Sequence, residues 1–370
     1  MSSSEKEIKD AEVVVIIPCY QPDNQLIYLL EDFLKLRINE YIVLVNDGSG
    51  KEYETVFSDA EQIIGRFGIV LQHEFNIGKG DALKTGFMYV IEHLLVKRNI
   101  IGVVTADADG QHSPGAIMKI VELLRKNENV DGIILGIRDF SGSSIPWKSV
   151  IGNQLTRKAF KFVTGKKITD TQTGLRGLPI GIVERCINIP GRRFEYETEV
   201  LLEVARTGEV IEESIPTIYD SVENHITHFN PIIDSVKIYV VLLKNFVKYS
   251  ISSILSAVID LLLFVIFCRW TRSYLSTFYI MVSTVMARIL SASFNFITNR
   301  KIVFKSEKNF ISAASLYLIL CIVQMLTSGI LVTVVELMFP YNEVLIKIFI
   351  DTGLFFGSYY VQQNHIFRGN

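Results

Sequence analysis

The chain has 370 residues, a formal net charge of −2 and 49% hydrophobic residues. That length suffices for about two domains, and the near-zero charge argues against a nucleic-acid-binding protein, which would need a basic surface. The mean hydropathy of +0.31 is high for a soluble protein. Because long apolar runs begin only after Tyr239, the sequence predicts a soluble first domain followed by a membrane domain.

Five apolar, β-branched segments alternate with helix-like segments in the first part of the chain. The predicted strands lie within residues 12–18, 41–50, 68–74, 100–110 and 130–138. A helix is predicted over residues 25–36, and a glycine-broken loop leads into another within residues 76–95. This alternation indicates an α/β domain with a mostly parallel sheet and helices on both faces. Without a G-x-G-x-x-G or Walker A motif, a dehydrogenase or P-loop NTPase is disfavoured.

Three aspartates stand at the carboxyl ends of these strands, where ligands bind in such sheets. Asp47 ends the second strand and Asp107 and Asp109 end the fourth, so we expect them to share one site. Asp107, Asp109 and Gln111 can present oxygens to one hard cation, since Mg²⁺ is held by one or two carboxylates together with substrate phosphates. The alternative is plain turn chemistry at both places, as in Asn-Asp-Gly-Ser-Gly.

Five motifs recur in this first part in a fixed order. They are VVIIPCYQPDNQL, VLVNDGSG, NIGKGDALKTGF, TADADGQHSP and ITDTQTGLRGLP. Their order and spacing over residues 12–230 resemble family 2 glycosyltransferases of the GT-A fold. Within that family the likeness is greatest to the polyprenyl-phosphate sugar transferases, which include dolichyl-phosphate mannose synthases and bacterial undecaprenyl-phosphate glucosyl- or N-acetylglucosaminyl-transferases. The resemblance implies a GT-A domain that uses a nucleotide sugar and a divalent metal, Mg²⁺ or Mn²⁺.

The resemblance also implies roles for individual residues in donor binding. The residues expected to contact the nucleotide sugar are Pro18, Tyr20, Asp47, Lys79 and Asp107. The residues expected to hold the metal and the diphosphate are Asp107, Asp109 and Gln111. For Lys79, in Gly-Lys-Gly, a solvated loop lysine is the alternative to a phosphate contact.

A basic segment with interleaved apolar residues covers residues 136–167. The pattern suits contact with an anionic bilayer surface, and an ordinary amphipathic helix on the sheet is the alternative. Arg138 and Arg176, followed by Arg157, are the candidates for binding an acceptor phosphate, because a planar guanidinium can donate two parallel hydrogen bonds to it. The cluster at residues 194–197 either lies near the sugar or only caps a helix.

Four apolar segments in the second part are predicted to span a membrane. They cover residues 250–268, 277–297, 310–335 and 344–361, after an interfacial amphipathic helix at residues 231–249. Buried core helices are the alternative. Lysines and arginines cluster on one side, at Lys244, Lys248, Arg300, Lys301, Lys305, Lys308 and Arg368. By the positive-inside rule, the first domain and both termini are expected in the cytoplasm, most simply at a prokaryotic cell membrane.

The two helical hairpins of this second part form a weak repeat. FITNRKIVFKS closes the first and YYVQQNHIFRGN closes the second, and the pattern resembles the GtrA-like membrane family, which is associated with lipid-linked sugars. Asp260, Arg288 and Asp351 lie inside the predicted spans, where ionisable residues are costly. They either form structural ion pairs or line a polar path for a lipid head group.

Together these features predict inverting transfer of one sugar from a nucleotide sugar to a polyprenyl phosphate, undecaprenyl or dolichyl. UDP-glucose or UDP-N-acetylglucosamine is favoured and GDP-mannose comes next. An anionic acceptor needs no strong base, so Asp109, Arg138 and Arg176 are expected to act by positioning and charge. The alternatives are a translocase for lipid-linked sugars and a processive synthase, although Ile266 stands where the Q-x-x-R-W motif of such synthases needs glutamine. A homo-oligomer is compatible with the sequence.

Overall fold

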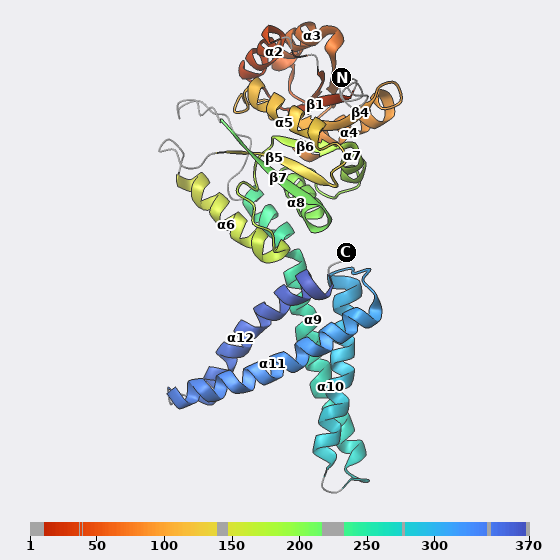
Figure 1. Ribbon diagram of the computed structural model, residues 1–370, viewed down its shortest axis with the longest axis vertical. Helices are drawn as coiled ribbons and strands as arrows, with labels where there is room; N and C mark the ends of the chain where they lie inside the picture. Colours follow the sequence, from red (N-terminus) through yellow and green to blue (C-terminus); the bar gives the residue numbers. More distant parts are fainter. Residues whose placement is uncertain are drawn as a thin grey trace. The chain divides into compact units, whose positions relative to one another are not determined.

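The computed structural model describes residues 11–36, 38, 40–138, 147–216, 233–275, 278–338 and 342–367, without the side chains of 147–152, 233 and 343 (Figure 1). The chain divides into two compact units, one of Met1–Lys161 with Lys166–Leu242 and one of Phe162–Gly165 with Leu243–Asn370. Several predicted features lie outside the described residues. These are the polar N-terminus, residues 139–146 of the basic segment, the end of the first domain, the start of the interfacial helix, residue 277 and Arg368.

A seven-stranded sheet forms the centre of the first unit, in the order β3-β2-β1-β4-β6-β5-β7. The strands are β1 Glu12–Cys19, β2 Tyr41–Asn46, β3 Gly68–Gln72, β4 Ile100–Thr105, β5 Gly132–Arg138, β6 Arg176–Pro179 and β7 Glu209–Ile215. All neighbouring pairs are parallel except those of β6, which runs antiparallel to β4 and β5. The mostly parallel sheet and its five predicted strands are confirmed, whereas β6 and β7 were not predicted.

Helices cover both faces of this sheet, which explains the continuous apolar run in β1. Val13, Val15 and Ile17 pack in one core with α2 Gln25–Lys35, α3 Glu54–Ile64 and α5 Pro114–Lys126. Because side chains alternate along a strand, Val14 and Ile16 point to the other face. There α4 Lys79–Tyr89 contacts β1 and β2, and α7 Ile180–Cys186 and α8 Glu195–Thr207 pack against α4.

The remaining elements of the first unit are three short segments and one longer helix. They are η1 Lys51–Tyr53, η2 Gly65–Phe67, η3 Val90–Leu94 and α6 Trp147–Thr164. Three chain segments meet at one edge of the sheet. β2 ends just before Asp47, β4 ends two residues before Asp107, and the antiparallel β6 begins there, with Arg176 paired to Thr105. Because β2 and β4 are parallel, the predicted aspartates lie at the same end of the sheet. The chain segment that precedes β6 reaches this end as well, because β6 runs antiparallel.

The second unit contains long apolar helices. They are α9 Ile233–Thr271, α10 Tyr279–Thr298 with η4 Asn299–Val303, α11 Phe310–Met338 and α12 Glu343–Val361 with η5 Gln362–Ile366. Within the described residues, four helices are long and apolar enough to cross a membrane, which confirms the four predicted spans. The single helix α9 covers both the predicted interfacial segment from residue 233 onwards and the first span.

The two hairpins of this unit end in the same local structure, as the repeat predicts. The helices α10 and α12 each pass into a π-helical segment, η4 and η5, at matching positions of the two repeat sequences. Asn299 and Gln362, the first residues of these segments, are buried and hydrogen-bonded to each other, with Asn299 Nδ2 donating to Gln362 Oε1 at 3.0 Å. A hydrogen bond between two buried amide side chains thus joins the two hairpins.

The ionisable residues within the spans are paired. Arg288 Nη2 lies 3.4 Å from Asp260 Oδ2, and Ser291 donates to the other oxygen of Asp260 at 2.8 Å. Lys347 Nζ lies 2.9 Å from Asp351 Oδ2, one helical turn away. Asp260 and Arg288 thus form the ion pair that the sequence allowed as one of two alternatives, and pairing lowers the cost of placing these charges in lipid.

Candidate active site

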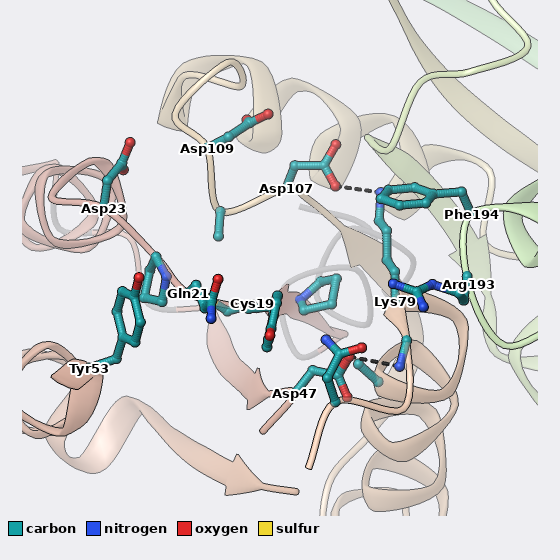
Figure 2. A pocket seen from close by; sticks show the side chains of 17 residues that line it. Cys19, Gln21, Asp23, Asp47, Tyr53, Lys79, Asp107, Asp109, Arg193 and Phe194 are labelled. Carbon is teal, nitrogen blue, oxygen red and sulfur yellow. Dashed lines mark hydrogen bonds and ion pairs between the residues drawn. The ribbon is translucent and has the colours of Figure 1, made fainter. Parts of the chain in front are cut away.

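A cavity of about 490 Å³ opens at the carboxyl edge of the sheet (Figure 2). This volume falls in the range of small-molecule sites, roughly 300–1,000 Å³. Its wall comes from the ends of β1, β2 and β4, the start of α4 and the segment before α8. The lining residues are Pro18, Cys19, Tyr20, Gln21, Pro22, Asp23, Asp47, Tyr53, Asn76, Gly78, Lys79, Ala82, Asp107, Ala108, Asp109, Arg193 and Phe194.

Asp47 anchors the loop that leads into α4. Its buried carboxylate accepts hydrogen bonds from the backbone N–H groups of Ile77 at 3.0 Å and Gly78 at 2.8 Å. Nδ1 of His73 lies 2.8 Å from the same carboxylate. Gly78 has φ +110°, and a Cβ there would overlap the carbonyl of Arg192, so glycine is required. Asp47 therefore shapes the cavity wall, and its predicted contact with the nucleotide stays a prediction.

Lys79 joins two acidic residues from distant parts of the chain. Its ammonium lies 2.7 Å from Asp107 Oδ1 and 2.9 Å from Glu197 Oε2. Lys79 begins α4, Asp107 follows β4, and Glu197 lies in the first turn of α8. Figure 2 shows the lysine rising from the cavity wall toward Asp107, beside the ring of Phe194. The three elements thus converge on one partly buried cation.

Burial and nearby charges shift the pKa values of Asp107 and Asp109, the two carboxylates among the predicted metal ligands. Burial alone would raise the pKa of Asp107, but the charges of Lys79, His112 and Arg138, together with the hydrogen bond from Lys79, outweigh it and lower that pKa to about 2. Burial and the neighbouring charge of Asp107 raise the pKa of Asp109, and the hydrogen bond from the N–H of Gln111, at 3.1 Å, offsets this only in part. Among the described residues, Asp109 therefore forms no ion pair, whereas Asp107 is paired with Lys79.

The segment just before β6, residues 170–175, packs against the end of β4 and against Asp107. The side chain of Thr105 donates to the carbonyl of Gly174 at 2.8 Å, and a Cβ on Gly174 would overlap the carboxylate of Asp107. In the same segment, Asp170 is fully buried and accepts from Arg138 Nε at 2.7 Å and Nη2 at 3.0 Å. This bidentate pair holds the segment against the end of β5.

We expect Gly174→Ala to reduce sugar transfer at least tenfold, because the added methyl group displaces the carboxylate of Asp107 and misplaced groups at a reacting site are costly to the rate. The check is a transfer assay together with thermal unfolding of the full chain. Gly181→Ala is the matched control, since nothing lies within 4 Å of a Cβ at that position in α7. Equal behaviour of the two variants would contradict this account of the close contact.

The structure separates the predicted site residues into two groups. Pro18, Tyr20, Asp47, Lys79, Asp107 and Asp109 line the cavity, whereas Gln111, Arg138, Arg157 and Arg176 do not. Arg176 is only 3% exposed and donates from Nε to the carbonyl of Thr173 at 2.9 Å. Arg157 donates from Nε to the carbonyl of Ile168 at 3.1 Å. Arg138 still acts on the cavity, since its charge helps to lower the pKa of Asp107.

Three residues at or behind the cavity wall were not among the predicted site residues. Glu197 holds Lys79, Asp170 holds Arg138, and Arg193 lines the cavity. Glu197 belongs to the Phe-Glu-Tyr-Glu cluster at residues 194–197. For this cluster the sequence allows either a contact with the sugar or a helix cap. Glu195 accepts from the backbone N–H of Arg192 at 3.2 Å, in the turn just before α8, and the N-terminus of α8 has no side-chain cap hydrogen bond. Sequence spacing contains no signal that separates these two glutamates.

The donor set at the end of β4 fits a divalent metal whose coordination a substrate completes. Asp107 and Asp109 supply carboxylates, and Gln111, two residues further on, has an amide oxygen but does not line the cavity. Within the described part of the chain, no group of three or more His, Cys, Asp or Glu residues could hold a metal by itself. Such a sparse oxygen set is typical of Mg²⁺, which keeps positions for water and substrate phosphates.

Two family models match the chain. Residues 14–186 match the model described as Glycosyl transferase family 2, and residues 248–367 match that of the GtrA/DPMS transmembrane domain. The chain is therefore a glycosyltransferase of family 2 type, with the GT-A fold that the five motifs predicted. It joins this catalytic domain to a GtrA/DPMS transmembrane domain and is an integral membrane protein.

Curated relatives match about half to three fifths of this chain. An uncharacterized protein of Methanocaldococcus jannaschii is 29% identical over 224 residues, 59% of this chain and 86% of that protein. The UDP-N-acetylglucosamine–dolichyl-phosphate N-acetylglucosaminyltransferase of Methanococcus voltae is 26% identical over 57% of this chain and 87% of that protein. The undecaprenyl-phosphate 4-deoxy-4-formamido-L-arabinose transferase of Serratia proteamaculans is 28% identical over 48% of this chain, which spans about half (52%) of that relative.

Proposed function

We propose that this protein transfers one sugar from a nucleotide sugar to a polyprenyl phosphate and inverts the anomeric configuration. The observation that carries the proposal is the cavity in which Asp107, Asp109 and Lys79 converge, within a family 2 glycosyltransferase domain attached to membrane helices. Two relatives are named as transferases to dolichyl and undecaprenyl phosphate. The acceptor must be a lipid that a membrane-anchored active site can reach.

The residues of the cavity suit a reaction driven by positioning and charge. Asp107, Asp109 and Gln111 would hold Mg²⁺ or Mn²⁺, which neutralises the departing nucleoside diphosphate when bound. Pro18, Tyr20 and Asp47 would contact the nucleotide. A polyprenyl phosphate is already anionic, so no side chain has to remove a proton from it.

We propose that arginine side chains of the first domain bind the acceptor phosphate. Arg138, Arg157 and Arg176 are the candidates, and Arg138 has the strongest support because its charge already acts on Asp107. Its guanidinium is oriented by the two hydrogen bonds to Asp170. A fixed guanidinium loses little conformational freedom when it binds a phosphate.

The active site is proposed to face the cytoplasm together with both termini. The support is the excess of lysine and arginine at one end of the spans, at Lys244, Lys248, Arg300, Lys301, Lys305 and Lys308. By the positive-inside rule this end is cytoplasmic.

We expect UDP-glucose or UDP-N-acetylglucosamine to be the donor, with GDP-mannose next. Purified protein in lipid should be incubated with each labelled nucleotide sugar and one polyprenyl phosphate, undecaprenyl or dolichyl in separate arms. Butanol-extractable label from one donor supports the proposal and names the sugar. No lipid-linked label from any donor would overturn it and favour a translocase that acts on preformed lipid-linked sugars.

Arg193→Ala is expected to raise KM for the nucleotide sugar about tenfold, a loss of one charge-assisted hydrogen bond, with a smaller change in kcat. Figure 2 shows the guanidinium of Arg193 pointing into the cavity beside Lys79, and no other described side chain pairs with it. Arg192→Ala is the matched control, because the Arg192 side chain is 79% exposed and lies 3.6 Å from Asp81. Steady-state kinetics of both variants would decide, and equal KM values would contradict the assignment.

A further inference from the structure

Lys79 pairs with two carboxylates, and one oxygen of the second, Glu197, has no hydrogen-bond donor among the described residues. Its ammonium contacts Asp107 Oδ1 and Glu197 Oε2, while the other oxygen of Glu197, Oε1, is buried and accepts no hydrogen bond from any described residue. The whole Glu197 residue is 8% exposed. An unsatisfied buried carboxylate oxygen is costly, so a second arrangement of donors around Glu197 is expected in another state of the site.

The ammonium of Lys79 also stands where a metal would need to bind. It lies 2.7 Å from Asp107 Oδ1, and a Mg²⁺ ion on that oxygen would sit about 2.1 Å from it. A metal on Asp107 would place a second cation close to the ammonium of Lys79, and two neighbouring cations repel each other strongly at a partly buried site. The metal and Lys79 therefore compete for Asp107.

We propose that Lys79 is an internal counter-cation, which neutralises Asp107 in the absence of donor and shifts fully to Glu197 when a divalent metal arrives with a nucleoside diphosphate. The inference rests on the metal site of the proposed function. Glu197 is then a positioning residue, whose free Oε1 accepts the N–H that Asp107 gives up. The shifted ammonium stays at the cavity wall, beside Phe194 and within reach of a phosphate.

This exchange makes the binding of the metal depend on the nucleotide. Without a diphosphate, a divalent ion must displace Lys79 and add its charge beside Asp107, Asp109 and Glu197. With a diphosphate, the added negative charge offsets both cations. The two ligands are therefore positively coupled, and the coupling must be reciprocal.

The test measures Mn²⁺ binding rather than catalysis. Purified full chain in detergent is titrated with Mn²⁺ alone, with Mn²⁺ plus UDP and with Mn²⁺ plus GDP, and free Mn²⁺ is followed by electron paramagnetic resonance. Wild type is expected to bind Mn²⁺ at least tenfold more tightly with one of the nucleotides. Lys79→Met should bind Mn²⁺ about tenfold more tightly than wild type when no nucleotide is present, and its coupling should shrink accordingly.

Lys84→Met is the matched control, because Lys84 lies on the same helix and contacts Asp81 at 3.3 Å instead of the metal ligands. Its Mn²⁺ binding should equal that of wild type. Glu197→Gln is the second variant, which keeps the size of the side chain and removes the charge that receives Lys79. In the presence of nucleotide, Glu197→Gln should bind Mn²⁺ about tenfold more weakly than wild type. This variant tests the role of Lys79 even if Lys79→Met does not fold.

The outcomes separate this inference from the proposed function. If wild type binds no Mn²⁺ with any nucleotide, the proposed metal site and the inference both fall. If wild type shows the coupling, but Lys79→Met gains no affinity without nucleotide or Glu197→Gln loses none with it, the metal site stands and the counter-cation role of Lys79 is overturned.

Discussion

Asp109→Ala is expected to lower the rate of sugar transfer by about 100- to 1,000-fold, the range for losing one group that stabilises charge in a transition state. Asp109 lines the cavity next to Asp107 and contacts no cation of the protein in an ion pair among the described residues. Its carboxylate is thus available to the proposed metal. Transfer measured at saturating donor is the check, and near-wild-type transfer would remove Asp109 from the site.

The same residue should be unfavourable for stability in the unliganded protein. Burial and the charge of Asp107 raise the pKa of Asp109 above its ordinary value of 3.8. The folded state then binds this proton more tightly than the unfolded state, so stability falls as pH rises through the raised pKa. Asp109→Asn removes this penalty and should unfold at an equal or higher temperature than wild type at pH 7, although it transfers little sugar.

Asp107 should show the opposite pH dependence. Its pKa of about 2 in the folded protein lies below the ordinary 3.8, so it contributes stability that is present above 3.8 and lost as pH falls toward 2. Thermal unfolding of Asp107→Asn and Asp109→Asn across this pH range separates the contributions of the two carboxylates. A lower unfolding temperature for Asp109→Asn than for wild type at pH 7 would show that the charge of Asp109 stabilises the fold.

Asp170→Ala is expected to destabilise the catalytic domain by about 3 kcal/mol, because removing one partner of a buried pair leaves the other charge uncompensated. Asp170 is 0% exposed and the Arg138 side chain is 19% exposed. The variant also frees the guanidinium that is proposed to bind the acceptor, so KM for polyprenyl phosphate should rise. Unfolding of the full chain by heat and by denaturant provides the measurement.

The control for this variant is an ion pair of the same two residue types at the surface. Asp131 pairs with Arg185, and their side chains are 65% and 43% exposed. Exposed pairs contribute about 0–1 kcal/mol, so Asp131→Ala should leave stability nearly unchanged. If Asp170→Ala unfolded at the same temperature as Asp131→Ala, the pair with Arg138 would not hold the segment before β6.

The order of strands and spans could be predicted because each depends on local patterns. The run Glu12–Cys19 is apolar at every position from Val13 onwards, as expected for a strand covered on both faces. The spans are recognisable by length and hydropathy alone. Strand β6 escaped prediction because it has only four residues, two of them glycine and proline, and its antiparallel pairing with β4 depends on neighbours distant in sequence.

The sequence by itself determined the α/β domain, the four spans and the aspartates at the carboxyl ends of the strands, since short-range patterns specify all of these. Only the tertiary structure decided which charge neutralises which. Lys79 meets Glu197 across 118 positions of the chain (197 − 79), and Asp170 rather than a ligand holds Arg138. In a buried site the partner of a charge depends on distance in space and on the lack of solvent screening, and sequence spacing records neither.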